Sequence, residues 1–262
     1  MLKYILLAVL LFVCYNIDMW LGLFASLGCV IYILYLITPV IYSLNGNKYI
    51  NAGDNEMAMK MYEKAYKNGK NNPSIVLTYA ILKLKDGQAD EAIKIFNEIV
   101  LNPAYKLAVK NQAKQFRALA YHKTGQKEDA LEDALEIFEK YKNTMSYGLL
   151  GYLMLVNDKP VDEVIDFCKE AYEYNSDDRD IVDNLVFAYI KNKEFEKAKE
   201  YVDIMLEKFP QFVEAHYHGA ICYKNLGDIE KAKELVEKIK NCKRTFLTTV
   251  TEEEIEELKS QL

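Results

Sequence analysis

The chain has 262 residues, of which 27% are charged, and a formal net charge of −6, which argues against a nucleic-acid-binding surface. Its five cysteines, Cys14, Cys29, Cys168, Cys222 and Cys242, are odd in number and include no CxxC pair. This pattern argues against a disulfide framework. It favours reduced, buried thiols and a cytosolic domain.

Residues 1–38 differ from the rest of the chain, because Asp18 is the only charged residue between Lys3 and Lys48. A membrane-spanning helix needs about 20 apolar residues, so the stretch is long enough for two passes if Asn16 to Asp18 form the turn. Lys3 and the lysine-rich remainder then lie on one side, which the positive-inside rule makes the cytoplasm. We expect an anchor of two transmembrane helices in the cell membrane.

Two other interpretations of this stretch stay open. Residues 2–14 have the length of a signal-peptide core, although no Ala-x-Ala-like cleavage site follows them. A single long or re-entrant anchor is also compatible, because the first apolar segment, of about 14 to 16 residues, is short for a bilayer. A buried soluble helix pair is disfavoured, since neither segment has a polar face.

Pairs of helices are expected to follow the anchor directly, the first beginning at Pro39 without a linker. Their expected ranges are 39–51 with 55–68, 73–85 with 89–101, 105–123 with 127–142, 145–156 with 161–175, 178–191 with 194–208, and 212–225 with 229–241. Thr251 and Glu254 form a capping box before a last helix, in which Ile255, Leu258 and Leu262 make an apolar stripe. We expect this helix to cap the array.

Three series of residues recur at steps of 34, with one step of 38. Small side chains form the series Ala58, Ala92, Ala130, Val164, Ala198 and Ala232. A mainly aromatic series is Tyr49, Lys83, Tyr121, Leu155, Tyr189 and Tyr223. Turn residues are Gly53, Gly87, Gly125, Lys159, Lys193 and Gly227. Three series in one register identify a repeat protein.

The pattern Tyr49…Gly53…Ala58-x-x-x-Tyr62, with its later copies up to Ala232, resembles the tetratricopeptide repeat. The resemblance implies an all-α, right-handed superhelical solenoid of about six helical hairpins over residues 39–244, closed by a capping helix at 245–262. No such hairpin buries enough surface alone, so stacking is obligatory. In composition the chain is similar to membrane-anchored repeat proteins of low-GC Gram-positive bacteria.

The third repeat departs from the family pattern, because Lys114 and Arg117 stand where apolar residues are expected. The fourth and fifth repeats carry Tyr152 and Val186 where the family has a small residue. We therefore expect the first helix of the third repeat to be longer and locally out of phase.

Catalytic motifs are missing from the sequence, which contains no HExxH, no GxSxG, no phosphate-binding glycine loop and no nucleotide fingerprint. Of the three histidines, His122, His216 and His218, the last two lie two residues apart on a helix and point to different faces. We expect structural histidines, and neither an enzyme nor a cofactor, metal or small-molecule substrate.

The family resemblance implies that the first helix of each pair lines a concave groove that binds partner peptides. Carried over by register, the groove residues are Ile81, Leu84, Leu119, Leu149, Leu153, Val156, Phe187, Ile190, Tyr217 and Ile221. The same register adds Ser43, Asn47, Leu77, Gln115, His122, Asp183 and Lys224. Because this groove is apolar and lacks the lysines of a carboxylate clamp, it favours an apolar ligand. The alternative is that these residues only pack helix on helix.

These observations predict a membrane-anchored scaffold or adaptor that binds a hydrophobic peptide or an amphipathic helix of a protein partner. One alternative is a self-associating structural membrane protein whose groove is filled by another copy. Another is a co-chaperone-like subunit of a membrane complex.

Overall fold

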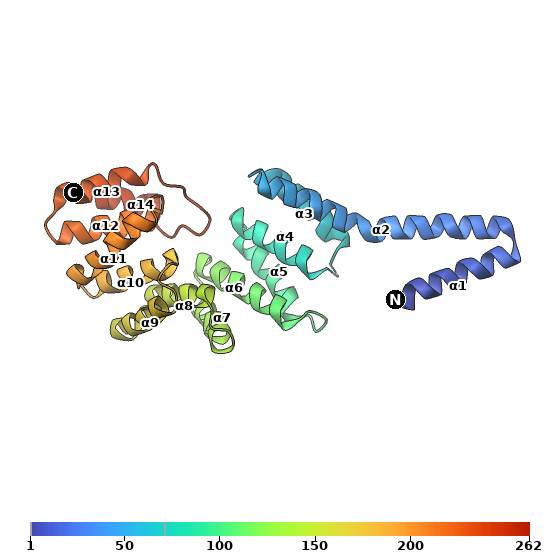
Figure 1. Ribbon diagram of the computed structural model, residues 1–262, viewed down its shortest axis with the longest axis horizontal. Helices are drawn as coiled ribbons and strands as arrows, with labels where there is room; N and C mark the ends of the chain where they lie inside the picture. The colour runs from blue at the N-terminus through green and yellow to red at the C-terminus, as the bar shows by residue number, and fades with distance from the viewer. Residues whose placement is uncertain (1, 71) are drawn as a thin grey trace. The chain divides into compact units, whose positions relative to one another are not determined.

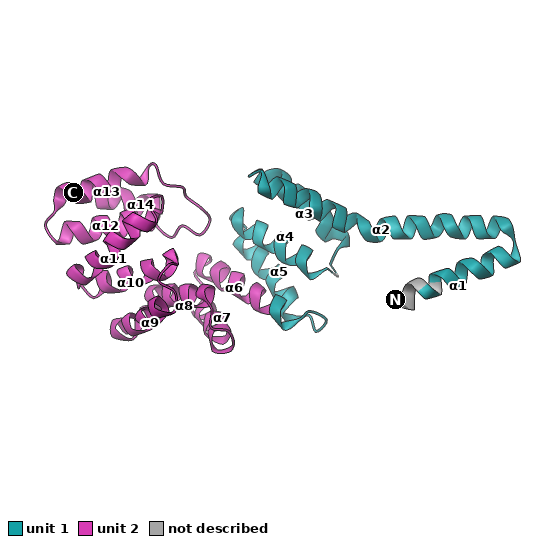
Figure 2. Cartoon of the chain, in the orientation of Figure 1, with its two compact units in different colours: residues 1–109 teal, residues 110–262 magenta. Residues whose placement is uncertain are grey.

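A computed structural model describes residues 2–70 and 72–262 of the chain (Figure 1). Across these two ranges it contains 14 α-helices and no β-strand, which confirms the predicted all-α fold. The helices group into two compact units, residues 1–109 and residues 110–262, coloured separately in Figure 2.

Within each unit consecutive helices pack against each other, and α10 also packs against α8 and α12, as stacked hairpins require. The first five helices are α1 (Leu2–Ile17), α2 (Met19–Asn51), α3 (Asn55–Asn68), α4 (Pro73–Lys85) and α5 (Ala89–Leu101). The remaining helices are α6 (Leu107–Lys123), α7 (Lys127–Lys140), α8 (Thr144–Val156), α9 (Val161–Tyr174), α10 (Arg179–Lys191), α11 (Phe195–Lys208), α12 (Val213–Asn225), α13 (Ile229–Ile239) and α14 (Glu252–Ser260).

The expected hairpins agree with these bounds to within two residues at each helix end, except at Pro39. The largest differences are at the start of α6 and the ends of α7 and α13. Helix α6 begins at Leu107 because the chain before it forms a turn, in which the Asn102 side chain accepts the N–H of Ala104 at 2.9 Å. Such a local side-chain bond competes with the helical hydrogen bonds.

At the N-terminus, α1 and α2 are joined by a one-residue turn at Asp18, which caps α2 by accepting the N–H groups of Trp20 and Leu21 at 2.8 and 3.1 Å. The two helices contact each other just beyond this turn. Gly22 lies against the Tyr15 ring so closely that a Cβ atom would come within 2.4 Å of it. The Tyr15 hydroxyl also lies 3.1 Å from Ser26 Oγ.

Helix α2 is longer than expected, because it runs without a break for 33 residues and includes Pro39. The prediction that a new helix begins at Pro39 is therefore wrong, and a domain boundary after residue 38 stays a prediction. Within the described ranges, α2 is the one helix long and apolar enough to cross a membrane, and a signal sequence passes the same test. With 16 residues, α1 is shorter, and a second membrane pass stays a prediction.

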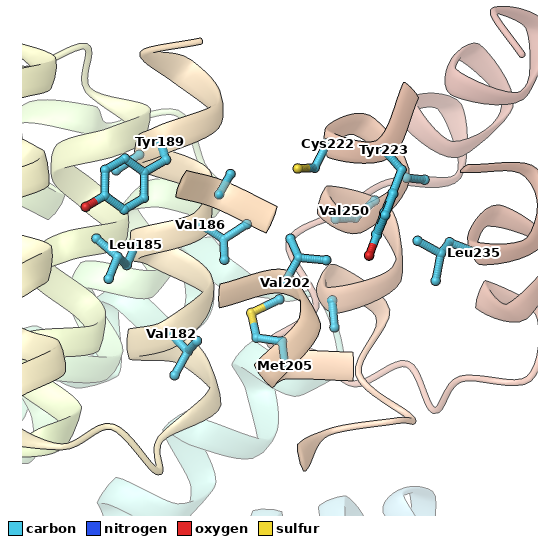
Figure 3. Packing of buried hydrophobic residues seen from close by; sticks show 14 of the residues in the cluster. Val182, Leu185, Val186, Tyr189, Val202, Met205, Cys222, Tyr223, Leu235 and Val250 are labelled. Atoms are coloured by element: carbon cyan, nitrogen blue, oxygen red, sulfur yellow. The ribbon is translucent and has the colours of Figure 1, made fainter. Parts of the chain in front are cut away.

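The core of the second unit contains the small residues of the repeat register. Ala198 on α11 and Ala232 on α13 are completely buried, which lets neighbouring helices approach closely. Val186 and Tyr189 from α10, Val202 and Met205 from α11, and Tyr223 from α12 fill the space around them (Figure 3). The side chains interlock from successive hairpins, so the hydrophobic burial of one repeat depends on the next.

The turns inside the hairpins explain the glycine series. Gly53, Gly87, Gly125 and Gly227 have φ between 77° and 87°, where a side chain is strained. In the fifth repeat Lys193 takes the same conformation with φ 59°. In the fourth repeat the residue with positive φ is Asp158, at 51°, one position before the expected Lys159.

The C-terminal segment closes the second unit. Thr251 and Glu254 form the predicted capping box, each side chain accepting a backbone N–H of the other residue, and this confirms the expected start of α14. Ile255 and Leu258 are 3% and 5% exposed, and Leu262 packs against the main core. Helix α14 therefore covers apolar surface that the array would otherwise expose.

Candidate functional site

The structure separates the predicted groove residues into core and partly exposed positions. Leu84 on α4 and Leu153 on α8 are 1% and 0% exposed. They pack helix on helix and offer no surface to a partner. Partly exposed positions are Ile81, Leu119, Leu149, Val156, Phe187, Ile190, Tyr217 and Ile221. Ile81 belongs to the first unit and the other seven to the second.

Six of these side chains follow three first helices of the second unit, and we call them the first-helix face. They are Leu149 and Val156 on α8, Phe187 and Ile190 on α10, and Tyr217 and Ile221 on α12. The α8 pair packs on a small core around Leu150, and the α10 and α12 pairs pack on the main core. Each of the six side chains packs against buried core residues on one side and keeps part of its surface in solvent.

Polar bonds fix α10 beside α8. Asn184 on α10 donates from Nδ2 to the carbonyl of Gly148 on α8 at 2.8 Å. Close to it, Gly151 leaves room for the Asn184 amide, which would lie 3.0 Å from a Cβ atom there. Lys191 donates to the carbonyl of Leu155, at the end of α8, at 2.6 Å. These bonds set the spacing of the first-helix face.

A buried ion pair lies beneath this face and was not predicted from the sequence. His218 Nδ1 on α12 lies 2.6 Å from Asp183 Oδ1 on α10, and the two residues are 4% and 7% exposed. The Phe187 ring stacks on the His218 ring, with centroids 4.8 Å apart and planes 17° apart. Burial lowers the pKa of His218, but the Asp183 carboxylate outweighs it and the net shift is upward.

Glu214, also on α12, is a second buried charge that sequence reasoning missed. It is 2% exposed, and its Oε1 accepts hydrogen bonds from the N–H of Thr249 at 2.7 Å and from its hydroxyl at 3.2 Å. Both contacts join residues 35 positions apart, His218 with Asp183 and Thr249 with Glu214. That spacing is the one signal in the sequence that pointed to them.

The other two histidines have structural roles, as expected. His216 Nε2 bonds to the carbonyl of Pro210 at 2.9 Å, and His122 Nε2 lies 3.0 Å from the Tyr152 hydroxyl. Burial lowers the pKa of both imidazoles, which therefore favour the neutral form. His122 lies on α6 at one edge of the predicted groove, where it anchors Tyr152 of α8.

Cysteine chemistry and metal binding receive no support from the geometry. Cys168 and Cys222 are buried, and burial raises the pKa of their thiols to about 12 and about 11. Such thiols stay protonated and unreactive. Within the described part of the chain, no three His, Cys, Asp or Glu side chains gather as a metal-binding group.

Repeat-family models match three parts of the chain. Two tetratricopeptide repeat models match residues 49–104 and 213–241, and a PPR repeat model matches residues 183–208. No curated protein matches the chain.

Solved structures agree with these repeats. A tetratricopeptide repeat protein from Parabacteroides merdae is 13% identical, with a TM-score of 0.63 over 86% of this chain and 85% of that one. PilF of Pseudomonas aeruginosa is 14% identical, with a TM-score of 0.61 over 86% of this chain and 98% of that one. MamA of Desulfovibrio magneticus, from residue 41 to its end, is 17% identical, with a TM-score of 0.53 over 65% of this chain and 94% of that one.

The fold and its repeat register define a helical-repeat protein built from stacked hairpins. The matched repeat models and the similar structures then identify the kind of repeat. Residues 49–104 and 213–241 are tetratricopeptide repeats, and the fold is that of a tetratricopeptide repeat solenoid.

Proposed function

We propose that this chain is a membrane-anchored scaffold that binds a peptide or amphipathic helix of a protein partner on its first-helix face. The observation that carries the proposal is the row of six partly exposed apolar side chains across α8, α10 and α12. An amphipathic helix presents apolar side chains at every third or fourth position and fits such a row. The rigid spacing of the three helices lowers the entropy that binding costs.

The proposal of membrane anchoring rests on the exposed apolar side chains of α1 and α2. Trp20, Phe24 and Ile31 are 64%, 71% and 59% exposed, and large apolar side chains surround α2 along its first 25 residues. Water is a poor solvent for a surface of this kind, whereas lipid tails solvate it well. Because α1 folds back beside α2 at Asp18 and is equally apolar, we propose that both helices enter the bilayer.

The topology follows from charge and length. Helix α1 has 16 residues, or about 24 Å at 1.5 Å per residue, and reaches across a bilayer core of about 30 Å only with local thinning. With the Asp18 turn outside, Lys48 and the repeats are cytoplasmic, as the positive-inside rule favours. A single pass through α2 would also place the repeats on the opposite side from Asp18, and it would differ only in leaving α1 at the interface instead of across the bilayer.

Protease accessibility tests the topology. Digestion of the repeats in inside-out vesicles but not in intact cells supports a cytoplasmic scaffold. A cysteine in place of Asn16 should react with an impermeant maleimide in intact cells, after replacement of Cys14 and Cys29 by serine. Digestion of the repeats in intact cells would contradict the proposal.

Photocrosslinking tests the first-helix face. A photoreactive amino acid at Ile221 should give a crosslinked protein product in cells. The matched control is Glu200, which is exposed on α11, a second helix. Equal yields at the two positions would contradict a binding face, and a product that contains a second copy of this chain would indicate self-association instead.

A further inference from the structure

Helix α3 runs back along α2 toward the apolar part of that helix. Near the start of this contact, the Tyr62 hydroxyl donates to Asn47 Oδ1 at 2.6 Å. Just after the end of α3, Gly69 lies against Pro39 so closely that a Cβ atom on the glycine would come within 3.0 Å of the proline Cβ. The turn between α3 and α4 therefore lies beside α2 at the level of Pro39.

The turn between α5 and α6 lies next to the turn between α3 and α4. The Tyr105 hydroxyl of the one donates to the carbonyl oxygen of Lys70 in the other. A hollow beside this bond is lined by both residues and by Val76, Glu98 and Leu101. Both turns belong to the first unit, coloured teal in Figure 2, and lie at the end of its repeats from which the free part of α2 extends. They form one surface.

In the proposed topology, Pro39 marks the level at which α2 leaves the hydrocarbon core of the bilayer. About 20 helical residues cross this core, and counted from the start of α2 at Met19 that length ends next to Pro39. The helix stays apolar beyond this point, since Ile41 and Leu44 are 49% and 58% exposed and the next charged residue is Lys48. Headgroups extend the bilayer by about 5–7 Å on each side. The two turns beside Pro39 therefore lie in the headgroup layer.

The turn between α5 and α6 presents apolar side chains at this level. Leu101 is 78% exposed, the largest fraction for any large apolar side chain among the described residues, and Leu107 is 54% exposed. Pro103 and Ala104 between them are exposed as well. Exposed leucines lose free energy in water, whereas the boundary between headgroups and acyl chains solvates them well. The turn thus has the side chains of an interfacial membrane contact.

Lysines accompany the leucines on this surface. Lys106 is exposed and forms no ion pair within the part of the chain that the structure describes. The Lys70 side chain is 59% exposed and lies 3.8 Å from Glu98, which also accepts the Tyr66 hydroxyl at 3.0 Å. Because Lys70 offsets the charge of Glu98, Lys106 leaves the surface positive. Ammonium groups at this level are attracted to the phosphates of anionic lipids.

We infer that the two turns form a second membrane contact. In this contact, Leu101 and Leu107 enter the boundary between headgroups and acyl chains, and Lys70 and Lys106 bind the phosphates of anionic lipids. The inference rests on the proposed anchoring by α2 and adds a contact outside the apolar segment. Attached both at α2 and at the turns, the first unit cannot rotate freely about the axis of α2, so it presents a fixed side to the membrane.

Tryptophan fluorescence tests this contact, because Trp20 is the only tryptophan of the chain. The full chain is reconstituted into vesicles of phosphatidylcholine and phosphatidylglycerol, with and without lipids brominated near the start of the acyl chains, which quench tryptophan at that depth. In a Trp20→Phe background, Leu101→Trp should be quenched several-fold more than Asp90→Trp. Asp90 is the matched control, because it is exposed near the other end of α5, about 17 Å away at 1.5 Å per residue.

The charge of the vesicles tests the lysines. Replacement of phosphatidylglycerol by phosphatidylcholine should lower the quenching of Leu101→Trp, because each lysine near an anionic surface favours the contact by about fivefold. Lys106→Gln should lower the quenching in anionic vesicles and leave it unchanged in pure phosphatidylcholine. The matched control is Lys94→Gln, which changes an exposed lysine one turn from Asp90 and should have no effect. Quenching that is independent of vesicle charge and of Lys106 would overturn the binding of phosphates.

The outcomes separate this inference from the proposed anchoring. Quenching of Trp20 in the unchanged chain, with equally weak quenching of Leu101→Trp and Asp90→Trp, would overturn the second contact and leave the anchor. Absence of Trp20 quenching would contradict the anchor itself, and the inference with it. Leu101 and Asp90 are both exposed, so neither replacement disturbs the core.

Discussion

Arg117 on α6 and Asp133 on α7 form a buried, bidentate ion pair. Arg117 donates from Nε to Asp133 Oδ2 at 2.7 Å and from an η nitrogen to Oδ1 at 2.6 Å. The two side chains are 14% and 6% exposed, and the parallel geometry is the strongest that arginine and a carboxylate adopt. The pair joins the two helices of the third repeat at a level where the other repeats have apolar contacts.

Removal of one partner of the Arg117–Asp133 pair should lower the free energy of unfolding strongly, whereas replacement of both partners should change it little. Asp133→Ala leaves the guanidinium buried without its carboxylate, and we expect a loss of about 3–5 kcal/mol in the free energy of unfolding. The double variant Arg117→Leu with Asp133→Leu should lie within about 1 kcal/mol of the unchanged chain. Urea unfolding followed by circular dichroism measures both. Equal losses in the two variants would show that the pair has no specific role.

The buried pair of Asp183 and His218 should make stability depend on pH. The pKa of His218 lies above its ordinary value of 6.5 in the folded chain, so protonation favours folding. Its contribution is complete below about pH 6.5 and is lost as the pH rises through the raised pKa. Asp183→Asn should therefore cost about 1.5–3 kcal/mol at pH 5.5 and less at pH 9.

The matched control for this dependence is Asp177→Asn, which removes an exposed pair with Lys208 at 2.7 Å. Exposed pairs contribute about 0–1 kcal/mol, so we expect a small cost. Glu214 and Glu254 also face His218 and add to its upward shift. An Asp183→Asn cost that stays constant between pH 5.5 and pH 9 would show that His218 does not change its charge in that range.

The helices could be predicted from the sequence because their repeat signals have local causes. Alanine stands at Ala198 and Ala232 because the helices pack closely there. Glycine stands at Gly87 and Gly227 because the backbone there has a positive φ. Where another residue adopts that conformation, the signal weakens. The fourth turn was therefore predicted one residue late, at Lys159 instead of at Asp158.

The candidate site was harder to predict, because register gives the position of a residue on its helix but not its depth. Leu149 and Leu153 lie one turn apart on α8, yet only Leu149 keeps surface in solvent. The carboxylate partners of buried basic side chains could not be predicted from the sequence either. Arg117 stood out as a charge at an apolar position, but its partner Asp133 comes from the second helix of the pair. Such pairings depend on how helices pack, which periodicity does not specify.

The turn between α10 and α11 offers a simple gain in stability. Lys193 has φ 59° at the position where Gly227 has φ 87° in the next repeat. Glycine adopts this conformation without the steric cost of a Cβ atom, so Lys193→Gly should stabilise the chain by about 0.5–1 kcal/mol. The reverse change, Gly227→Ala, should destabilise it by about 1 kcal/mol. Thermal unfolding of the two variants should show shifts of opposite sign.

Leu149 and Leu153 on α8 distinguish the first-helix face from the core beneath it. Leu153 is completely buried, so Leu153→Ala should cost about 2–5 kcal/mol through lost burial and the cavity it leaves. Leu149→Ala should cost about 1 kcal/mol, because this side chain is partly exposed. Binding should respond in the opposite order. At a temperature where both variants are folded, Leu149→Ala should lower the yield of partner crosslinking from Ile221 more than Leu153→Ala does. If Leu153→Ala has the larger effect on this yield, the face is set by core packing and the peptide does not contact α8 at Leu149.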